Sequence, residues 1–363
     1  MLIGGPRVDE IEVSVFGPGY GESIVIHAGL GDWVVVDSCQ LPRDTTPVAL
    51  QYLEAIGVNV ETQLKLVVAT HWHDDHIRGL AAIVERAQQA RFVASMAMAN
   101  SIDFLTAVSL DERRLLAQNS GVTEFAKIIR VLKARRQASA TYPIEWALVD
   151  RTIWNRPGSI NATAQCLSPS DADFHLLLTR FQNLMPKPGT DVTSVPDESP
   201  NLSAVVVWMC CGQQEMLLGS DLENNANPHR GWSAILANVN RPTGRASVYK
   251  VPHHGSATAH EPQVWQQLLT TNPFAAVTPF NHPPKLPQPA MIQTLRGLTA
   301  NAFLTNVAGD EPTKFSDRTA TKTIRDFKYS IRQPRHYGQV RFRADAMRPN
   351  SWSFELSPVA QRL

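Results

Sequence analysis

The segment His-x-His-x-Asp-His at residues 71–76 places four potential metal ligands within six residues of this chain. It directly follows residues 64–69, a short apolar run that predicts a β-strand. A strand end holds the following loop rigidly, and imidazole and carboxylate groups are the ligands of hydrolytic zinc and manganese sites. Burying several ionisable groups without a partner would be costly. We therefore predict that the segment binds one or two divalent ions, Zn²⁺ or Mn²⁺.

Three other groups of polar residues stand at the ends of apolar runs. Asp37 follows residues 33–36, Asp221 follows residues 216–220, and His253 and His254 follow residues 248–252. Each position alone is weak evidence for a site, because a polar residue often caps a strand. Together with residues 71–76, they predict carboxylates and imidazoles gathered at one rim of a sheet sandwich.

The hydrophobic pattern predicts an α/β fold with strands towards both ends of the chain. Residues 11–16 alternate apolar and polar side chains, and residues 23–27 and 33–37 form a hairpin pattern. Apolar strands resume at 202–209, 215–218, 246–251 and 275–279, and residues 339–343 and 351–356 read as a closing hairpin. We expect one domain over 1–363, with two packed sheets, helices outside them and a helical and loop insertion at 96–200.

Composition narrows the classes of function. The formal net charge is +1, so a site for nucleic acid or another anion has to be a local patch. No apolar run of about 18 residues occurs, and the N-terminus has no basic leader before an apolar run, so we expect no membrane span, no secretory signal and a cytoplasmic location. The four cysteines include no Cys-x-x-Cys pair, which disfavours a thiolate zinc site.

The motif at 71–76 resembles the signature of the metallo-β-lactamase superfamily. The flanking segments look like the hydrolase domain of the competence protein ComEC, in order and in rough spacing. These segments are Gly-Tyr-Gly-Glu-Ser at 19–23, Val-Val-Val-Asp at 34–37, Asn-Leu-Ser-Ala-Val-Val at 201–206, Leu-Gly-Ser-Asp-Leu-Glu at 218–223 and Lys-Val-Pro-His-His-Gly-Ser at 250–256. The resemblance covers about 11–80 and 201–356, and residues 96–200 match poorly. It implies an αβ/βα four-layer sandwich with metals at its rim.

The resemblance also implies roles for single residues. His71 and His73 would bind a first metal, Asp75 and His76 a second, and Asp221 would bridge the two. Asp75 would also orient the hydroxide, as a catalytic residue.

Three more roles follow from the same resemblance. His254 would be the late ligand of the second metal, and His253 would lie behind the ligands or act catalytically on the leaving group. Asp37 would bind no metal and would orient the ligand loop through hydrogen bonds.

The chain departs from the family pattern in three places. The superfamily often has another histidine before the strand near 202, where this chain offers Asn201 and Ser203, so the first metal has fewer protein ligands. Ser220 replaces the glycine before the bridging aspartate. The late Gly-His-Pro segment falls near 285–287 without its histidine, for which His282 is a candidate substitute.

Hydrolysis by a metal-activated hydroxide is the expected chemistry. The resemblance favours a phosphodiesterase or nuclease, and basic groups at 127–136 and 314–348 offer contacts for phosphates. The low net charge favours a small nucleotide or a strand end over long DNA. A hydrolase of a lactone, amide or thioester is one alternative, and a regulatory or binding protein with a weakened first metal site is another. We expect the 96–200 insertion to roof the site, and the oligomeric state stays open.

Overall fold

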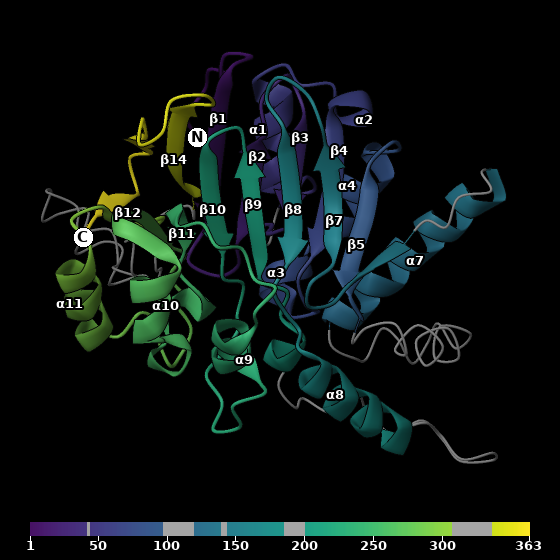
Figure 1. Ribbon diagram of the computed structural model, residues 1–363. Helices are drawn as coiled ribbons and strands as arrows, with labels where there is room; N and C mark the ends of the chain where they lie inside the picture. Colours follow the sequence, from purple (N-terminus) through teal and green to yellow (C-terminus); the bar gives the residue numbers. More distant parts are fainter. Residues whose placement is uncertain (42–43, 97–119, 139–143, 185–199, 307–335) are drawn as a thin grey trace, which may run out of the picture.

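Two eight-stranded sheets packed face to face form the centre of the molecule (Figure 1). The structure is a computed structural model, and it describes residues 1–363 except 42–43, 97–119, 139–143, 185–199 and 307–335. All statements on elements and contacts below concern these described residues.

The first sheet has the strand order β15-β14-β1-β2-β3-β4-β5-β6. The run from β3 to β6 is parallel, and the other pairs are antiparallel. Its strands are β1 (Glu10–Gly17), β2 (Ser23–His27), β3 (Trp33–Val36), β4 (Leu64–Ala69), β5 (Arg91–Ser95), β6 (Ile144–Ala147), β14 (Gly338–Asp345) and β15 (Ser353–Leu356). The hairpin predicted near the C-terminus is confirmed by the pairing of β14 with β15.

The second sheet has the order β16-β13-β12-β11-β10-β9-β8-β7. Here the run from β10 to β13 is parallel. Its strands are β7 (Thr152–Arg156), β8 (Ala162–Cys166), β9 (Val207–Cys211), β10 (Gln214–Leu218), β11 (Ala246–Lys250), β12 (Leu269–Val277), β13 (Ala302–Leu304) and β16 (Gln361–Arg362).

Helices cover the outer face of each sheet (Figure 1). The first sheet packs under α1, α4 and α7, and the second under α9, α10 and α11. The helices are α1 (Val48–Ala55), α2 (Val60–Gln63), α3 (Asp74–Ile77), α4 (Leu80–Arg86), α7 (Ser120–Ala138), α8 (Asp171–Leu184), α9 (Gly231–Ala237), α10 (Pro262–Gln267) and α11 (Pro289–Leu298), with 3₁₀ turns η2 (Pro200–Ser203), η3 (His253–Gly255) and η4 (Ala257–Ala259). The four-layer αβ/βα sandwich predicted from the sequence is confirmed.

The apolar runs of the central strands follow from burial on both faces. Val34 and Val36 of β3 point into the core between the sheets, whereas Val35 points into the core under the helices. On β10, Met216 belongs to the inner core and Leu217 to the outer one. Strands covered on both faces read as continuous apolar runs, and each fully buried side chain of this kind contributes about 1.5–3 kcal/mol.

The topology brings the carboxyl ends of several strands to one rim. Asp37 follows β3, and residues 71–76 follow its parallel neighbour β4. Asp221 and His253 follow β10 and β11, which are parallel neighbours in the second sheet. Because neighbouring parallel strands end at the same edge of a sheet, each pair of loops is placed side by side.

The predicted insertion at 96–200 contains both helices and strands. Helices α7 and α8 fit the expectation of helical structure, and residues 185–199 lie outside the described residues. Strands β6, β7 and β8 also lie in this range, and β6 and β7 form the outermost strands of the two sheets. Short strands with mixed polarity give little periodic signal, so they were not expected there. The boundaries of an insertion stay a prediction.

None of the helices among the described residues is long and apolar enough to cross a membrane.

His27, at the end of β2, holds the turn that joins β2 to β3. Its Nδ1 lies 2.8 Å from the Glu10 carbonyl oxygen, and the Gly31 amide donates to its Nε2 over 3.0 Å. The ring therefore donates through Nδ1 and accepts through Nε2, which requires the neutral form. Burial lowers the pKa of His27 to about 4.

We expect His27 to make the folding free energy depend on pH. Because its folded pKa lies below the ordinary value of 6.5, its contribution is complete above pH 6.5 and falls as the pH drops towards 4. Urea unfolding at pH 8 and pH 5 should show a loss of stability that is about 2 kcal/mol larger in the wild type than in His27→Gln. His229→Gln, in an exposed loop, is the control and should keep the wild-type difference. Equal losses in wild type and His27→Gln would contradict this account.

Candidate metal centre

The candidate site lies at the rim where the carboxyl ends of the strands meet, and it contains strained backbone. Asp37, Ser220, His253 and His254 have φ values of 58°, 47°, 45° and 53°. Residues other than glycine rarely adopt this left-handed conformation, and such residues concentrate at functional sites. Ser220 stands where the family has glycine, so the chain keeps this conformation at a cost in strain.

Asp37 fixes the orientation of His76. Its Oδ2 lies 2.8 Å from His76 Nδ1, and both the amide and the hydroxyl of Thr70 donate to its carboxylate over 2.8 and 2.6 Å. With Nδ1 occupied, His76 turns Nε2 towards Asp221, whose Oδ1 lies 3.3 Å away. Asp37 thus lies behind the candidate ligand His76, and its role stays a prediction.

His71 and His73 converge from the loop after β4. His71 Nε2 lies 3.1 Å from His73 Nδ1 and 3.9 Å from Asp221 Oδ2. On its other side, His71 Nδ1 contacts the Thr70 hydroxyl at 3.0 Å. One ligand atom from each of His71, His73 and Asp221 lies within 4.8 Å of the others, which is close enough for a shared ion.

A second group forms around His254. The His254 Nδ1 lies 2.9 Å from the Thr278 carbonyl oxygen, so Nε2 faces the site. That Nε2 lies 3.0 Å from Asp75 Oδ2 and 3.7 Å from Asp221 Oδ2. Ligand atoms of His254, His76, Asp221 and Glu22 lie within 4.8 Å of one another. Asp221 belongs to both groups, which is the position that a bridging carboxylate needs.

The sequence reasoning missed a buried ion pair behind this group. Glu22 Oε2 lies 2.6 Å from Lys250 Nζ and accepts a hydrogen bond from the Thr278 hydroxyl at 2.5 Å. Both charged side chains are almost completely buried, and Glu22 Oε1 lies 3.8 Å from His76 Nδ1. Both residues stand in segments that carry the family resemblance, but no sequence pattern indicates that two charges so far apart in the chain meet.

Burial and the clustered charges shift the pKa values of the ligands in opposite directions. Burial lowers the pKa of His71 and His73 below 6.5. Burial acts the same way on His76 and His254, but the carboxylates around them outweigh it and raise both pKa values. Although burial alone would raise it, the pKa of Asp221 lies well below its usual value because His76 and His254 are close. The surrounding carboxylates thus favour the protonated forms of His76 and His254.

The cluster fits one or two divalent ions. Three buried polar atoms meet no hydrogen-bond partner, namely His76 Nε2, Asp221 Oδ1 and Glu22 Oε1. Unpartnered buried polar atoms are rare in folded proteins, and these three belong to the same ligand group. Imidazole nitrogens and carboxylate oxygens suit Zn²⁺ or Mn²⁺.

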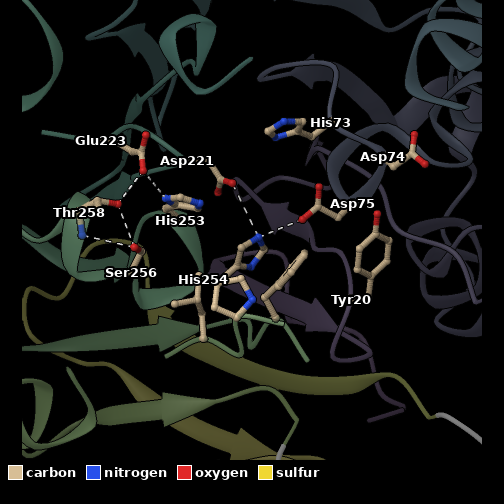
Figure 2. Close-up of a pocket in the computed structure, with 13 residues that line it drawn as sticks. Tyr20, His73, Asp74, Asp75, Asp221, Glu223, His253, His254, Ser256 and Thr258 are labelled. Atoms are coloured by element: carbon tan, nitrogen blue, oxygen red, sulfur yellow. Dashed lines mark hydrogen bonds and ion pairs between the residues drawn. The ribbon is translucent and has the colours of Figure 1, made fainter. Parts of the chain in front are cut away.

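His253 and Glu223 form a second pair beside the ligands. His253 Nδ1 lies 2.9 Å from Glu223 Oε1, and this contact lowers the pKa of Glu223. The Thr258 hydroxyl donates to the same carboxylate over 2.6 Å and fixes it further. The side chain of His253 is 22% exposed, whereas His254 is buried. In Figure 2, His253 lies between Glu223 and the candidate ligands Asp221 and His254.

Four of the candidate ligands, namely His73, Asp75, Asp221 and His254, line a cavity of about 700 Å³ together with the His253–Glu223 pair. In Figure 2, Tyr20 and the Glu223–His253 pair lie on opposite sides of the pocket, with Asp221 and His254 between them. Among the described residues, the lining contains no lysine or arginine. It consists of Tyr20, His73, Asp74, Asp75, Asp221, Glu223, His253, His254, Ser256, Thr258, Phe280, Pro284 and Leu286.

The chain lacks two histidines of the family pattern, and the candidates for the two positions have different surroundings. His282 belongs to none of the three potential ligand groups found among the described residues, and its ring packs against Tyr20 at 4.7 Å. Asn201 is 8% exposed, its Oδ1 meets no hydrogen-bond partner, and its side chain helps to lower the pKa of Glu223. Ser203 is fully buried. Asn201 thus offers a further oxygen near the site, whereas His282 lies outside the ligand groups.

Several described side chains of the two basic groups make structural contacts. On α7, Lys127 pairs with Glu124, and Arg135 donates to the carbonyl oxygens of Val84 and Ala87. In the basic tail, residues 314–335 lie outside the described residues.

Further along that tail, Arg341 pairs with Glu355, and Arg343 with Glu12. The guanidinium groups of Arg341 and Arg343 are thus held by protein carboxylates, and phosphate contacts of the basic tail stay a prediction.

Several solved structures are similar to this chain in overall arrangement. The metallo-β-lactamase fold protein YhfI from Bacillus subtilis is 11% identical, with 83% of this chain and 97% of that chain covered and a TM-score of 0.37. Zn²⁺-bound PqqB from Methylobacterium extorquens is 12% identical (65% and 71% covered, TM-score 0.33). A metallo-β-lactamase from Cronobacter sakazakii is 12% identical (65% and 76% covered, TM-score 0.31). Nothing about function follows from likenesses this weak.

The sequence itself matches one family model, described as the metallo-β-lactamase superfamily, over residues 16–153. None of the curated proteins matches the chain. The matched range contains Asp37 and residues 71–76, and thus the first half of the ligand cluster. Residues 16–153 are therefore similar to the metallo-β-lactamase superfamily, whose members are generally metal-dependent hydrolases.

Proposed function

We propose that this chain hydrolyses phosphodiester bonds in a nucleotide or at the end of a nucleic-acid strand. The observation that carries the proposal is the pair of ligand groups that share Asp221 at the base of the cavity, beside the His253–Glu223 pair. The ligands would be His71, His73, Asp75, His76, Asp221 and His254. The resemblance of five sequence segments to the hydrolase domain of ComEC supports the choice of bond, and that closer relationship is itself part of the proposal.

Each residue of the site has a task in such a reaction. A divalent ion bound there would supply a hydroxide near neutral pH, since it lowers the pKa of bound water to about 7. Asp75 can accept a hydrogen bond from that nucleophile and so orient it towards the substrate. Asp37 keeps the ring of His76 fixed through the 2.8 Å contact to Nδ1.

His253 is placed to donate a proton to the leaving oxygen. Glu223 binds Nδ1, so the remaining ring nitrogen, Nε2, is available to the substrate. A carboxylate behind an imidazole fixes the orientation of the ring, as a proton donor in general acid catalysis requires. Alkoxide leaving groups, such as the sugar oxygens of nucleic acids, need this proton most.

A neutral ester or lactone is a second candidate substrate. It is favoured by the cavity lining, which has no lysine or arginine among the described residues and includes Tyr20, Phe280 and Leu286. A panel of lactones and thioesters, assayed beside phosphodiesters on the same metal-loaded protein, separates the two candidates.

Replacement of Asp75 should abolish most of the activity while the fold persists. We expect Asp75→Ala to lower kcat/KM for bis(p-nitrophenyl) phosphate by about 100-fold or more, because general acid–base and orienting groups contribute that much. Asp74→Ala is the matched control, since the Asp74 carboxylate lies 3.3 Å from Arg78, an ion pair outside the ligand groups. Asp74→Ala should lower kcat/KM less than about tenfold.

Two outcomes would contradict the proposal. The proposal fails if metal-loaded wild-type protein leaves DNA, RNA, cyclic nucleotides and the nitrophenyl diester uncut. It also fails if Asp75→Ala and wild type hydrolyse them equally well.

The role of His253 predicts a dependence on the leaving group. We expect His253→Gln to lower kcat for a dinucleotide, whose leaving group is an alkoxide, by about 100-fold. The same variant should lose less than about fivefold on a p-nitrophenyl ester, whose leaving group needs no proton. Glu223→Gln should show the same pattern with smaller losses in kcat, since Glu223 acts through His253. Equal losses on both substrates would exclude a leaving-group role.

A further inference from the structure

Aromatic rings form one wall of the cavity, next to the ligands. The ring centroids of Tyr20 and Phe280 are 5.4 Å apart, and His282 lies 4.7 Å from Tyr20 and 5.7 Å from Phe280. Phe280 in turn lies 5.3 Å from the ring of His254. Tyr20 and Phe280 are half-buried and line the cavity, and His282 is exposed. This aromatic wall, Tyr20–Phe280–His282, therefore begins directly beside a proposed metal ligand.

Two loops that are distant in sequence hold the wall in place. The Asn281 amide donates to the Gly19 carbonyl oxygen over 2.7 Å, which joins the loop after β1 to the loop after β12. Phe280 and Leu286 exchange two backbone hydrogen bonds of 2.9 Å each, which closes the second loop on itself. Gly19 has a φ of 89°, which favours glycine, and a Cβ there would lie 2.2 Å from Asn281 Nδ2 unless that side chain moved.

Further contacts fix the Tyr20 ring itself. The guanidinium carbon of Arg78 lies 5.7 Å from the ring centroid, and Arg78 also pairs with Asp74. The ring is therefore held from the protein side and does not need a ligand to order it. Pre-ordered rings lose little conformational entropy on binding, which favours recognition by stacking.

The charges around the cavity limit what the wall can accept. Four carboxylates line the cavity, those of Asp74, Asp75, Asp221 and Glu223, and no described lysine or arginine does. A substrate with several negative charges would be repelled outside the ligand cluster. A planar ring that carries one phosphodiester places its charge at the ligands and its uncharged part against the wall.

We propose that the aromatic wall Tyr20–Phe280–His282 is a stacking subsite for a planar aromatic ring, with the chemistry of a nucleobase. The ring would stack on this wall while the adjoining phosphodiester lies at the ligands. The position of the phosphodiester rests on the proposed function, whereas the stacking of the ring does not. Stacking of a base on an aromatic side chain tolerates all bases and contributes about 1–3 kcal/mol, or at least about fivefold in affinity.

Binding of adenosine tests the subsite without turnover. The probes are adenosine and ribose, which differ only by the base, titrated into metal-free full-length protein and followed by NMR. Wild-type protein should bind adenosine, and ribose should not bind measurably. We expect Tyr20→Ala to weaken adenosine binding at least about fivefold and Tyr20→Phe to retain it, because the ring rather than the hydroxyl does the stacking.

Two further variants control for loss of structure. Phe280→Ala removes a second ring of the wall and should weaken adenosine binding if Tyr20→Ala fails to fold. Phe354→Ala removes an exposed ring of β15, outside the cavity lining, and should leave adenosine binding unchanged. The subsite is excluded if adenosine binds no better than ribose, or if Tyr20→Ala and Phe280→Ala both bind it as the wild type does.

Kinetics separate this inference from the proposed function. With metal-loaded protein, Tyr20→Ala should raise KM for thymidine 5′-(p-nitrophenyl) phosphate at least about fivefold with little change in kcat. The KM for methyl p-nitrophenyl phosphate, which lacks the nucleobase, should rise less in the variant than the KM for the thymidine ester. If wild-type protein cleaves neither diester but adenosine binding depends on Tyr20, the proposed function fails and the subsite stands.

Discussion

The carboxylate of Asp221 lies between two pairs of imidazoles, and the fold holds these side chains in place. His71 and His73 approach it from the first sheet, together with His76, and His254 approaches from the second sheet. Such a cluster of buried ionisable groups is stable only when opposite charges compensate one another. In the folded chain, protons on two imidazoles or bound divalent ions can provide that compensation, so the site is already assembled to accept metal.

A second layer of charged groups keeps the first one in place. Asp37 binds His76 from behind, and the buried Glu22–Lys250 pair joins the loop before β2 to the end of β11. Removal of one partner from such a buried pair typically costs about 3–5 kcal/mol, so these contacts are part of the fold as well as of the site. The two sheets are thus joined by the apolar core between them and by polar contacts at the rim where the ligands lie.

Much of this site follows from the sequence because its ligands stand at strand ends. Residues 71–76 combine a recognisable spacing with an apolar strand before them, and Asp37, Asp221 and His254 each follow a run that is buried on both faces. Contacts between segments that are distant in sequence give no such signal. The pairing of Glu22 with Lys250 and of His253 with Glu223 depends on how the loops meet in space. The strands β6 to β8 were missed for another reason, namely that they are short and of mixed polarity.

The central claim is that this cluster binds divalent ions, and anomalous diffraction tests it most directly. Crystals of the full chain would be soaked in Zn²⁺ or Mn²⁺ and measured at the absorption edge of each metal. The account predicts an anomalous peak within bonding distance of His76, Asp221 and His254, and a second peak, where both sites fill, next to His71, His73 and Asp221. Fully soaked crystals with no peak at either position, or with peaks only elsewhere on the surface, would contradict it.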